Sequence, residues 1–169
     1  MPDLSSLAQL DDKVLELVVE DGETRLASQF GLMQATTGSA FTVAGFAIAG
    51  ATAALGAALA AARAAPPDWG VGAIAGGFAL VEGIAAALAI DTARPRPKHI
   101  PGNEPGEWAK DSGPMTYKEA LIQKAQVLQT MLDVNDAAIE SASRRLRWSL
   151  RVGAAGVVLG LVAIPMLVV

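Results

Sequence analysis

Hydrophobic and polar positions along the chain separate into long blocks. Residues 31–62 and 152–169 contain no charged side chain, and residues 69–90 contain only Glu82. Apolar windows of about 18–25 residues are the length at which a helix crosses the hydrocarbon core of a bilayer. The pattern therefore predicts three membrane-spanning helices. We place them at about residues 41–62, 69–90 and 149–169.

Residues 1–30 predict a helical N-terminal region, because apolar residues recur in it at spacings of three and four. The apolar residues that define this face are Leu7, Leu10, Val14 and Leu17. The dipeptide Asp21-Gly22 predicts a break or kink, followed by a second helix that starts at about residue 23 and continues into the first span. We expect the acidic face of this region to be solvated surface.

A second extramembrane helix is predicted over residues 116–148, directly before the last span. Thr116 and Glu119 match the capping box that starts many helices. The apolar positions that follow alternate at spacings of four and three, which is the pattern of a coiled-coil seam. The seam consists of Leu121, Ala125, Leu128, Leu132, Asn135, Ile139, Ala142 and Leu146. Its partner is either the chain's own N-terminal helix or the same helix in neighbouring subunits, and the polar Asn135 would set its register and oligomeric state.

These elements together predict an all-α, oligomeric protein. It is a three-span transmembrane helical bundle with an N-terminal cytoplasmic helix and a long coiled-coil-like stalk helix that runs into the last span. A seam that mixes leucine, isoleucine and alanine suggests a tetramer. The regions are an N-terminal helical region (1–30), a transmembrane hairpin (31–90), a proline-rich basic loop (91–115), the stalk helix (116–148) and the third span (149–169).

The distribution of basic residues orients the predicted spans. Residues 1–30 contain two of the 13 lysines and arginines, residues 91–151 contain ten, and the turn at 63–68 contains one. Basic residues collect on the cytoplasmic side of membrane proteins. We therefore expect an inner (plasma) membrane protein with residues 1–30 and 91–148 in the cytoplasm and the C-terminus outside, with Trp69 and Trp148 at the interfaces.

The composition excludes most enzyme chemistry. The chain of 169 residues has no cysteine and a single histidine, His99. It therefore lacks a thiolate nucleophile, a disulfide, a cysteine-ligated zinc and a multi-histidine metal site, and no P-loop or HExxH motif is present. We expect a protein that is not an enzyme and that carries no cofactor.

Glu82 is the one ionisable residue deep inside a predicted span. It shares a helix face with alanines, and a carboxylate at this depth normally faces a bundle interior or an aqueous cavity. One interpretation is that Glu82 is hydrogen-bonded to Thr42 or Thr52 and fixes helix packing. The other is that copies of Glu82 from several subunits attract cations into a pore.

The first span is rich in small residues, which allow helix backbones to approach closely in lipid. Its row of small residues is Gly45, Ala49, Ala53 and Ala57. This row packs within a compact three-helix unit, or it is shielded from lipid by other subunits and lines a pore.

Arg94, Arg96 and Lys98 lie in the proline-rich loop, where the backbone is extended. These three cations are an ordinary cytoplasmic anchor or a phosphate-binding strip, since arginine and lysine on extended backbone suit anionic ligands.

The stretch from Leu128 to Asn135, followed by Ser143-Arg144-Arg145-Leu146-Arg147-Trp148, resembles the helix that enters the last span in transmembrane effectors of bacterial antiphage signalling systems. The whole layout is also similar to these effectors, of the Pycsar, CBASS and Hailong types. The resemblance implies an oligomeric effector that permeabilises or depolarises the inner membrane under the control of a cytoplasmic nucleotide or oligonucleotide made by a partner enzyme. The phosphate contacts that it implies are Arg94, Arg96, Lys98, Arg144, Arg145 and Arg147.

Two other functions fit the same sequence. A non-conducting membrane scaffold would recruit partners through the coiled-coil seam. A holin-like lysis protein would permeabilise the membrane without any cytoplasmic ligand.

Overall fold

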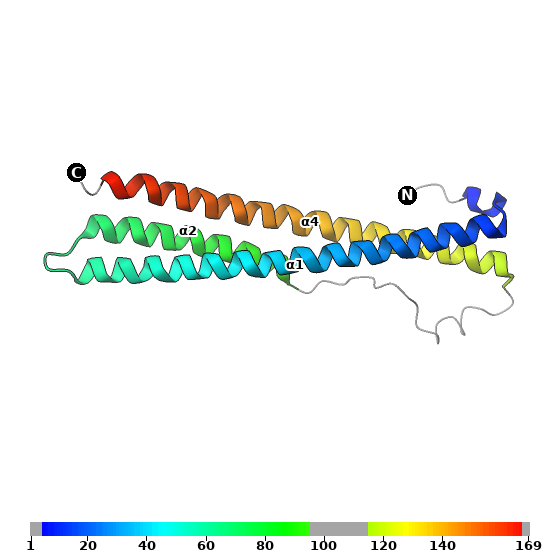
Figure 1. Ribbon diagram of the computed structural model, residues 1–169, viewed down its shortest axis with the longest axis horizontal. Coiled ribbons are helices and arrows are strands. Elements are labelled where there is room, and N and C mark those ends of the chain that lie inside the picture. Colours follow the sequence, from blue (N-terminus) through cyan, green and yellow to red (C-terminus); the bar gives the residue numbers. More distant parts are fainter. Residues whose placement is uncertain (1–4, 95–114, 167–169) are drawn as a thin grey trace. The chain divides into compact units, whose positions relative to one another are not determined.

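The computed structural model describes residues 5–94 and 115–166, and this part of the chain is all-helical. A short 3-10 helix, η1 (Ser5–Gln9), precedes three long helices (Figure 1). These are α1 (Asp12–Arg63), α2 (Trp69–Ala93) and α4 (Tyr117–Met166). They form two compact units. Unit 1 holds η1, α1 up to Gln34 and α4 up to Glu140; unit 2 holds the rest of α1, all of α2 and the rest of α4.

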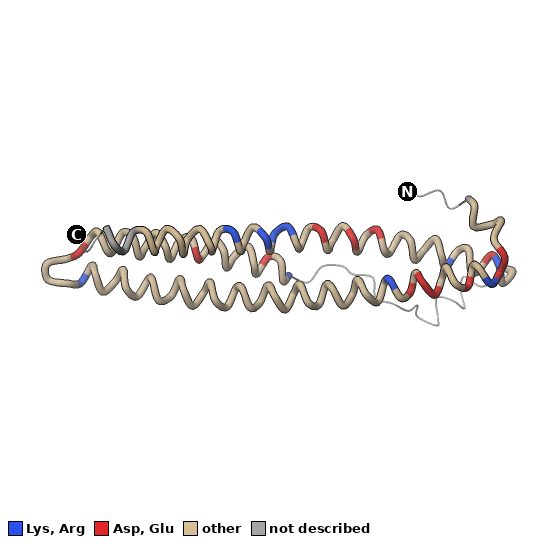
Figure 2. The backbone as a smooth tube through the Cα atoms, turned by 45° about the horizontal axis from the view of Figure 1, so that its top comes forward, with Lys and Arg blue, Asp and Glu red and all other residues tan. Residues whose placement is uncertain are grey.

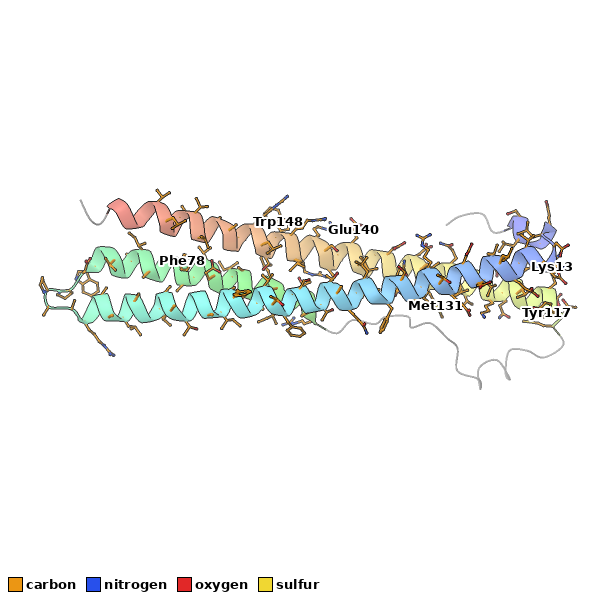
Figure 3. The ribbon with its side chains drawn as sticks, in the orientation of Figure 1. Lys13, Phe78, Tyr117, Met131, Glu140 and Trp148 are labelled. Atoms are coloured by element: carbon orange, nitrogen blue, oxygen red, sulfur yellow. The ribbon has the colours of Figure 1, made fainter. Side chains whose placement is uncertain are left out.

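In unit 1, α1 and α4 run parallel to each other. Near the start of both helices, the Tyr117 hydroxyl donates a hydrogen bond of 2.6 Å to Glu16 Oε1. Further along both helices, Arg25 forms an ion pair of 3.4 Å with Asp136. The residues that contact each other therefore occur in the same order along α1 and α4. Figure 3 shows Lys13 and Tyr117 at the same end of unit 1.

The core of unit 1 is a seam of leucines between α1 and α4. Its buried members are Leu7, Leu15, Val19, Leu26, Leu121, Ala125, Leu128 and Leu132. Leu7 lies on η1, and the members on α1 and α4 follow spacings of four, three or their sum, seven, which keeps one stripe facing a parallel partner. Of the two partners considered for the stalk seam, the chain's own N-terminal helix is the one that packs against it in this core.

Two expectations for residues 1–30 are wrong. The first concerns the second half of the predicted apolar face: Leu7 is buried and Leu10 packs against the core, but Val14 and Leu17 are 42 % and 60 % exposed. Within α1 the buried residues are instead Leu15, Val19 and Leu26. The helix also runs without a break through Gly22. A Cβ atom at Gly22 would lie 3.2 Å from Leu128 Cδ1, so this glycine provides room for a core leucine.

The capping box at the start of α4 is confirmed. The Thr116 N–H donates to Glu119 Oε2 at 2.7 Å, and the Thr116 hydroxyl donates to the same oxygen at 2.8 Å. In return, the Glu119 N–H donates to Thr116 Oγ1 at 3.3 Å. This reciprocal arrangement satisfies backbone donors that have no partner within the helix.

The cap predicts an acid-sensitive helix start. The backbone N–H and then the hydroxyl of Thr116 hold the pKa of Glu119 below its ordinary value of 4.5. The charged carboxylate therefore stabilises the start of α4 above pH 4.5, and that stabilisation is lost as the pH falls through the lowered folded-state pKa. An NMR titration should give a Glu119 midpoint below 4.5 that moves upward in Thr116→Val. An unchanged midpoint in the variant would contradict this assignment.

In unit 2, α2 runs antiparallel to both of its neighbours. Against α4, the Ser149 hydroxyl donates to the Ala85 carbonyl at 2.7 Å, while a Cβ atom at Gly160, further along α4, would meet the earlier α2 residue Phe78 at 3.4 Å. Against α1, α2 folds back after a short turn (Figure 1). As predicted, α2 begins at Trp69, where the carboxylate of Asp68 accepts a cap hydrogen bond of 3.0 Å from the Val71 N–H.

Large apolar side chains are distributed in unit 2 in the opposite way to unit 1. Its buried residues are mostly alanines together with Glu82, Thr92 and Ser149, whereas its large apolar side chains point outward. The exposed ones include Phe41, Phe46, Ile48, Leu55, Leu59, Leu80, Ile84, Leu159, Leu161 and Val162. The described charged residues of unit 2 lie at the hairpin turn, at the end of α2 and in the middle of α4, where unit 2 begins (Figure 2). Glu82 is the exception among them, because it lies in the middle of α2.

Two helices, α1 and α2, are long and apolar enough to cross a membrane. Only 17 % of the most apolar window of α1 and 22 % of that of α2 are buried within the chain. The core helix of a water-soluble protein buries most of its apolar residues, so these helices differ from such a helix in where their apolar residues point.

Candidate functional site

Glu82 lies in the middle of α2 and is 6 % exposed. Glycines from both neighbouring helices surround its carboxylate. A Cβ atom at Gly50 of α1 would lie 3.7 Å from Glu82 Cγ. On α4, a Cβ atom at Gly153 would lie 3.6 Å from Oε2, and one at Gly156 would lie 3.0 Å from Oε1. The missing side chains of three glycines therefore make the space in which the carboxylate sits.

Within the described residues, Glu82 Oε1 is buried and accepts no hydrogen bond. The hydroxyl of Ser149, which lines the same groove, and those of the predicted partners Thr42 and Thr52 donate to backbone carbonyls. Ser149 donates to the Ala85 carbonyl. Thr42 donates to the carbonyl of Gly38 at 3.1 Å, and Thr52 donates to that of Ile48 at 2.8 Å. An orphaned oxygen of this kind is costly in a low-dielectric interior, because burial removes its water without a replacement donor.

Glu82 also lines a groove between the helices of unit 2. This groove has a volume of about 380 Å³, with walls from α1, α2 and α4 that include Ala47, Gly50, Phe78, Glu82, Gly153 and Val157. A second cavity of about 370 Å³ is lined almost entirely by apolar atoms, and Phe78 and Val157 line both cavities. Figure 3 labels Phe78 on α2. Among the residues that line the two cavities, Glu82 is the one with a charged side chain.

Most of the predicted row of small residues on α1 faces outward, although its last member, Ala57, lines the second cavity. A Cβ atom at Gly45 would meet no atom within 4 Å, and Ala49, Ala53 and Ala57 are exposed. The α1 residues that turn toward the groove and α2 are neighbours of that row, among them Ala44, Ala47, Gly50 and Ala54. The face of α2 that we expected Glu82 to share with Ala75, Ala79, Ala86 and Ala89 is confirmed in part. Ala86 and Ala89 are buried, whereas Ala75 and Ala79 are half-buried.

Two of the six candidate phosphate contacts come together around one carboxylate. Asp91 forms ion pairs with Arg94 at 3.4 Å and with Arg145 Nε at 3.5 Å. Arg144 and Arg147 are exposed on the same segment of α4. The other two candidates, Arg96 and Lys98, lie outside the described residues, as does most of the proline-rich loop.

Next to this basic segment, the Arg151 guanidinium lies 5.4 Å from the centroid of the Trp148 ring, a cation–π contact. Trp148, labelled in Figure 3, and Trp69 are both exposed, at the starts of the unit 2 portion of α4 and of α2. Indole rings at such positions are typical of a membrane–water interface.

The residues that we predicted to form an oligomer seam differ in burial along α4. Leu121, Leu128, Leu132 and Asn135 are buried in unit 1, and Ile139 and Leu146 are half-buried. Sequence reasoning missed Gln29, which packs against the same seam from α1. Its side-chain amide donates to the Leu132 carbonyl at 3.3 Å and to Asp136 Oδ1 at 2.7 Å.

Sequence reasoning also missed the residues of α4 that surround Glu82, although a signal for them existed. The spacing of four and three in the stalk seam continues past its last predicted member, Leu146, through Ser149, Gly153, Gly156 and Gly160. Extending the seam into the last apolar window would have identified the α4 face that meets α2.

Comparison of the chain with protein-family models, with curated proteins and with solved structures finds no match.

Proposed function

We propose that unit 2 is embedded in the inner membrane as three spans formed by α1, α2 and α4, with unit 1 in the cytoplasm and the C-terminus outside. The two units differ in whether their large apolar side chains lie inside or outside, and this difference supports the proposal. Leucines fill the core of unit 1, whereas unit 2 buries alanines and a glutamate and exposes its large apolar side chains. In lipid the outward apolar surface costs nothing, while in water a surface of this size would aggregate.

Two features support α4 as the third span. Val157, Val158, Leu159, Leu161 and Val162 are all exposed near its end, which suits contact with lipid tails. The described basic residues of unit 2 also favour this topology. Arg94 and four arginines of α4 lie at one end of its helices, whereas Arg63 and Asp68 offset each other at the hairpin turn.

We propose further that the protein is an oligomeric membrane effector that permits ions to cross the membrane past Glu82. The observation that carries this proposal is the buried carboxylate whose Oε1 accepts no hydrogen bond from the described residues. Buried acidic residues in membrane bundles commonly mark ion pathways. In the assembled protein, a neighbouring copy closes the open side of the groove and separates it from lipid, and a tetramer is the expected assembly.

A cytoplasmic nucleotide or oligonucleotide made by a partner enzyme would control this effector, as the resemblance to antiphage effectors implies. Its phosphates would be held by Arg94, Arg144, Arg145 and Arg147 at the basic end of unit 2, with Arg96 and Lys98. A phosphate group can compete with Asp91 for Arg94 and Arg145, because charge-assisted hydrogen bonds from arginine to phosphate are strong. Ligand binding would thereby alter the contact between the end of α2 and the middle of α4.

The burial of the stalk seam weighs against the scaffold function. Leu121, Leu128 and Leu132 are packed against α1 of the same chain, so a partner could reach them only after unit 1 opens. A holin-like protein differs from the proposed effector in needing no ligand, which a flux measurement distinguishes.

The test is cation flux through the full-length protein in liposomes, with and without the small anions that co-purify with it. A carboxylate about 4 Å from a passing cation attracts it by about 4 kcal/mol at an effective dielectric constant of about 20. We therefore expect Glu82→Gln to lower the flux by about tenfold or more.

The matched control is Glu20→Gln, the same chemical change at an exposed position of unit 1, which should leave the flux unchanged. Equal flux in Glu82→Gln and the unaltered protein would overturn the role of Glu82. Flux that is the same with and without the co-purified anions would favour a holin-like function, and no flux from a correctly inserted oligomer would overturn the effector.

A further inference from the structure

We propose that the outward face of α4, where unit 2 begins on this helix, is a binding site for an anionic phospholipid. The guanidinium groups of Arg147 and Arg151 hold the lipid phosphate, and an acyl chain lies along the apolar residues that follow on the same face. This inference rests on the placement of unit 2 in the membrane under the proposed function. It does not depend on whether the protein conducts ions or binds a nucleotide.

The two arginines lie on the face of α4 that points away from α2. The opposite face packs against α2 through Ser149, Gly153, Gly156 and Gly160. Residues three or four apart share one face of a helix. The residues of the outward face follow spacings of four, four, three and four, and all of them are exposed: Arg147, Arg151, Ala155, Val158 and Val162.

The outward pair of arginines carries two positive charges that no described carboxylate neutralises. Arg147 and Arg151 are four residues apart, or about 6 Å along the helix, so both can contact one phosphate group. Within the described residues, neither of them forms an ion pair. By contrast, Arg94 and Arg145 pair with Asp91 of α2. An anion can therefore bind the outward pair without displacing a carboxylate of the described chain.

The apolar part of the outward face has the depth of one lipid leaflet. Arg151 and Val162 are separated by about 16 Å of helix, and half of a hydrocarbon core is about 15 Å. Trp148 is 54 % exposed and makes the cation–π contact with Arg151, and indole rings favour the headgroup level of a membrane. The charged pair, the ring and the apolar residues therefore follow the order of a phospholipid from headgroup to tail.

Other occupants match this face less well. A free nucleotide would pair with the arginines but would leave the apolar residues uncovered. An apolar helix of a second copy would cover Val158 and Val162 but would bury two charges without a partner. A zwitterionic lipid would bring its own cation close to the guanidinium groups. An anionic phospholipid supplies the negative charge and the acyl chain together, and basic residues on the cytoplasmic side of a span attract such lipids.

The experiment measures the contact between lipid and Trp148 by fluorescence quenching. Trp69→Phe and Trp108→Phe leave Trp148 as the sole tryptophan of the full-length chain. The protein is reconstituted into phosphatidylcholine vesicles that contain increasing fractions of brominated phosphatidylglycerol or, in parallel, brominated phosphatidylcholine, because bromine quenches a ring only at close contact. We expect phosphatidylglycerol to bind about tenfold or more tightly than phosphatidylcholine, since each arginine near an anionic headgroup contributes a factor of about five.

A double variant removes the charged pair. In Arg147→Gln with Arg151→Gln, the two lipids should quench Trp148 equally, and continued quenching by brominated phosphatidylcholine establishes that the variant is inserted. The matched control is Arg63→Gln, the same change at an exposed arginine at the hairpin turn, which should keep the preference for phosphatidylglycerol. The same preference in the double variant and in the protein with both arginines would overturn the proposal.

Three further outcomes would also overturn it. If micromolar inorganic pyrophosphate abolished the preference, the arginines would belong to a free phosphate ligand. Equal quenching by the two lipids with both arginines present would overturn this inference and leave the membrane placement intact. Quenching by neither lipid would overturn this inference together with α4 as a span. Ion passage past Glu82 is measured separately as flux, so either proposal can fail while the other stands.

Discussion

Replacing Leu26 by alanine should destabilise unit 1 by about 2–5 kcal/mol, which is the usual cost of removing a fully buried leucine. Leu26 is 0 % exposed and lies in the seam with Leu128 and Leu132. The cost combines the lost transfer energy with the cavity that remains, because the leucines of α4 can relax only partly into the space. A loss of about 2 kcal/mol or more corresponds to a rise of about thirtyfold or more in the equilibrium constant for local opening of unit 1.

Amide hydrogen exchange of the full-length protein measures this opening segment by segment. Peptides from α1 and α4 of unit 1 should exchange faster in Leu26→Ala, whereas peptides from α2 should change little. The matched control is Leu17→Ala, the same substitution on an exposed face of the same helix, which should stay within about 0.5 kcal/mol of the unaltered protein. Equal effects of the two substitutions would contradict the assignment of the buried face.

Gly156→Ala should destabilise the contact between α4 and α2 by about 1–3 kcal/mol, the usual cost of overpacking. The new Cβ atom would lie 2.9 Å from Val81 Cγ1 and 3.0 Å from Glu82 Oε1. Val81 is β-branched and cannot rotate freely within a helix, so the helices must move apart. This movement would also displace the carboxylate of Glu82.

The control for Gly156→Ala is Gly83→Ala, one residue beyond Glu82 on α2. A Cβ atom at Gly83 would meet nothing within 4 Å in this chain, and alanine favours a helix over glycine by about 0.5–1 kcal/mol. The midpoint of unfolding by SDS, followed by circular dichroism in mild detergent, should fall for Gly156→Ala and stay equal or rise for Gly83→Ala. If the unfolding midpoint fell for Gly83→Ala and not for Gly156→Ala, the close helix contact would lie on the opposite face of α2.

The elements of this protein differ in how well the amino-acid sequence predicts them. The helices themselves could be predicted, because α2 begins at Trp69 and α4 begins directly after the capping box at Thr116. The face of α1 in unit 1 could not. Val14 and Leu17 are as apolar as Leu15 and Val19, and nothing in the local spacing says which stripe a partner 100 residues away will cover.

The seam of α4 was predictable because its spacing of four and three is sustained over many turns. Its partner was not predictable, because the spacing of one seam is equally compatible with the chain's own helix and with a second subunit. Gly22 illustrates the same limit. A glycine within a helical pattern is consistent with a break, and only the position of Leu128 reveals that the glycine makes room for a side chain.

What the amino-acid sequence determined is the helical class, the uneven distribution of charge and the isolation of Glu82 within an apolar window, because each of these depends on neighbours along the chain. What only the tertiary structure decided is which atoms surround that carboxylate. Gly50, Gly153 and Gly156 come from two other helices, and their separation in the chain hides a site that forms only when the three backbones approach closely. The physical reason is that three helices enclose the space together, so the spacing along α4 can indicate which of its faces packs but not which residues of α1 and α2 complete the space.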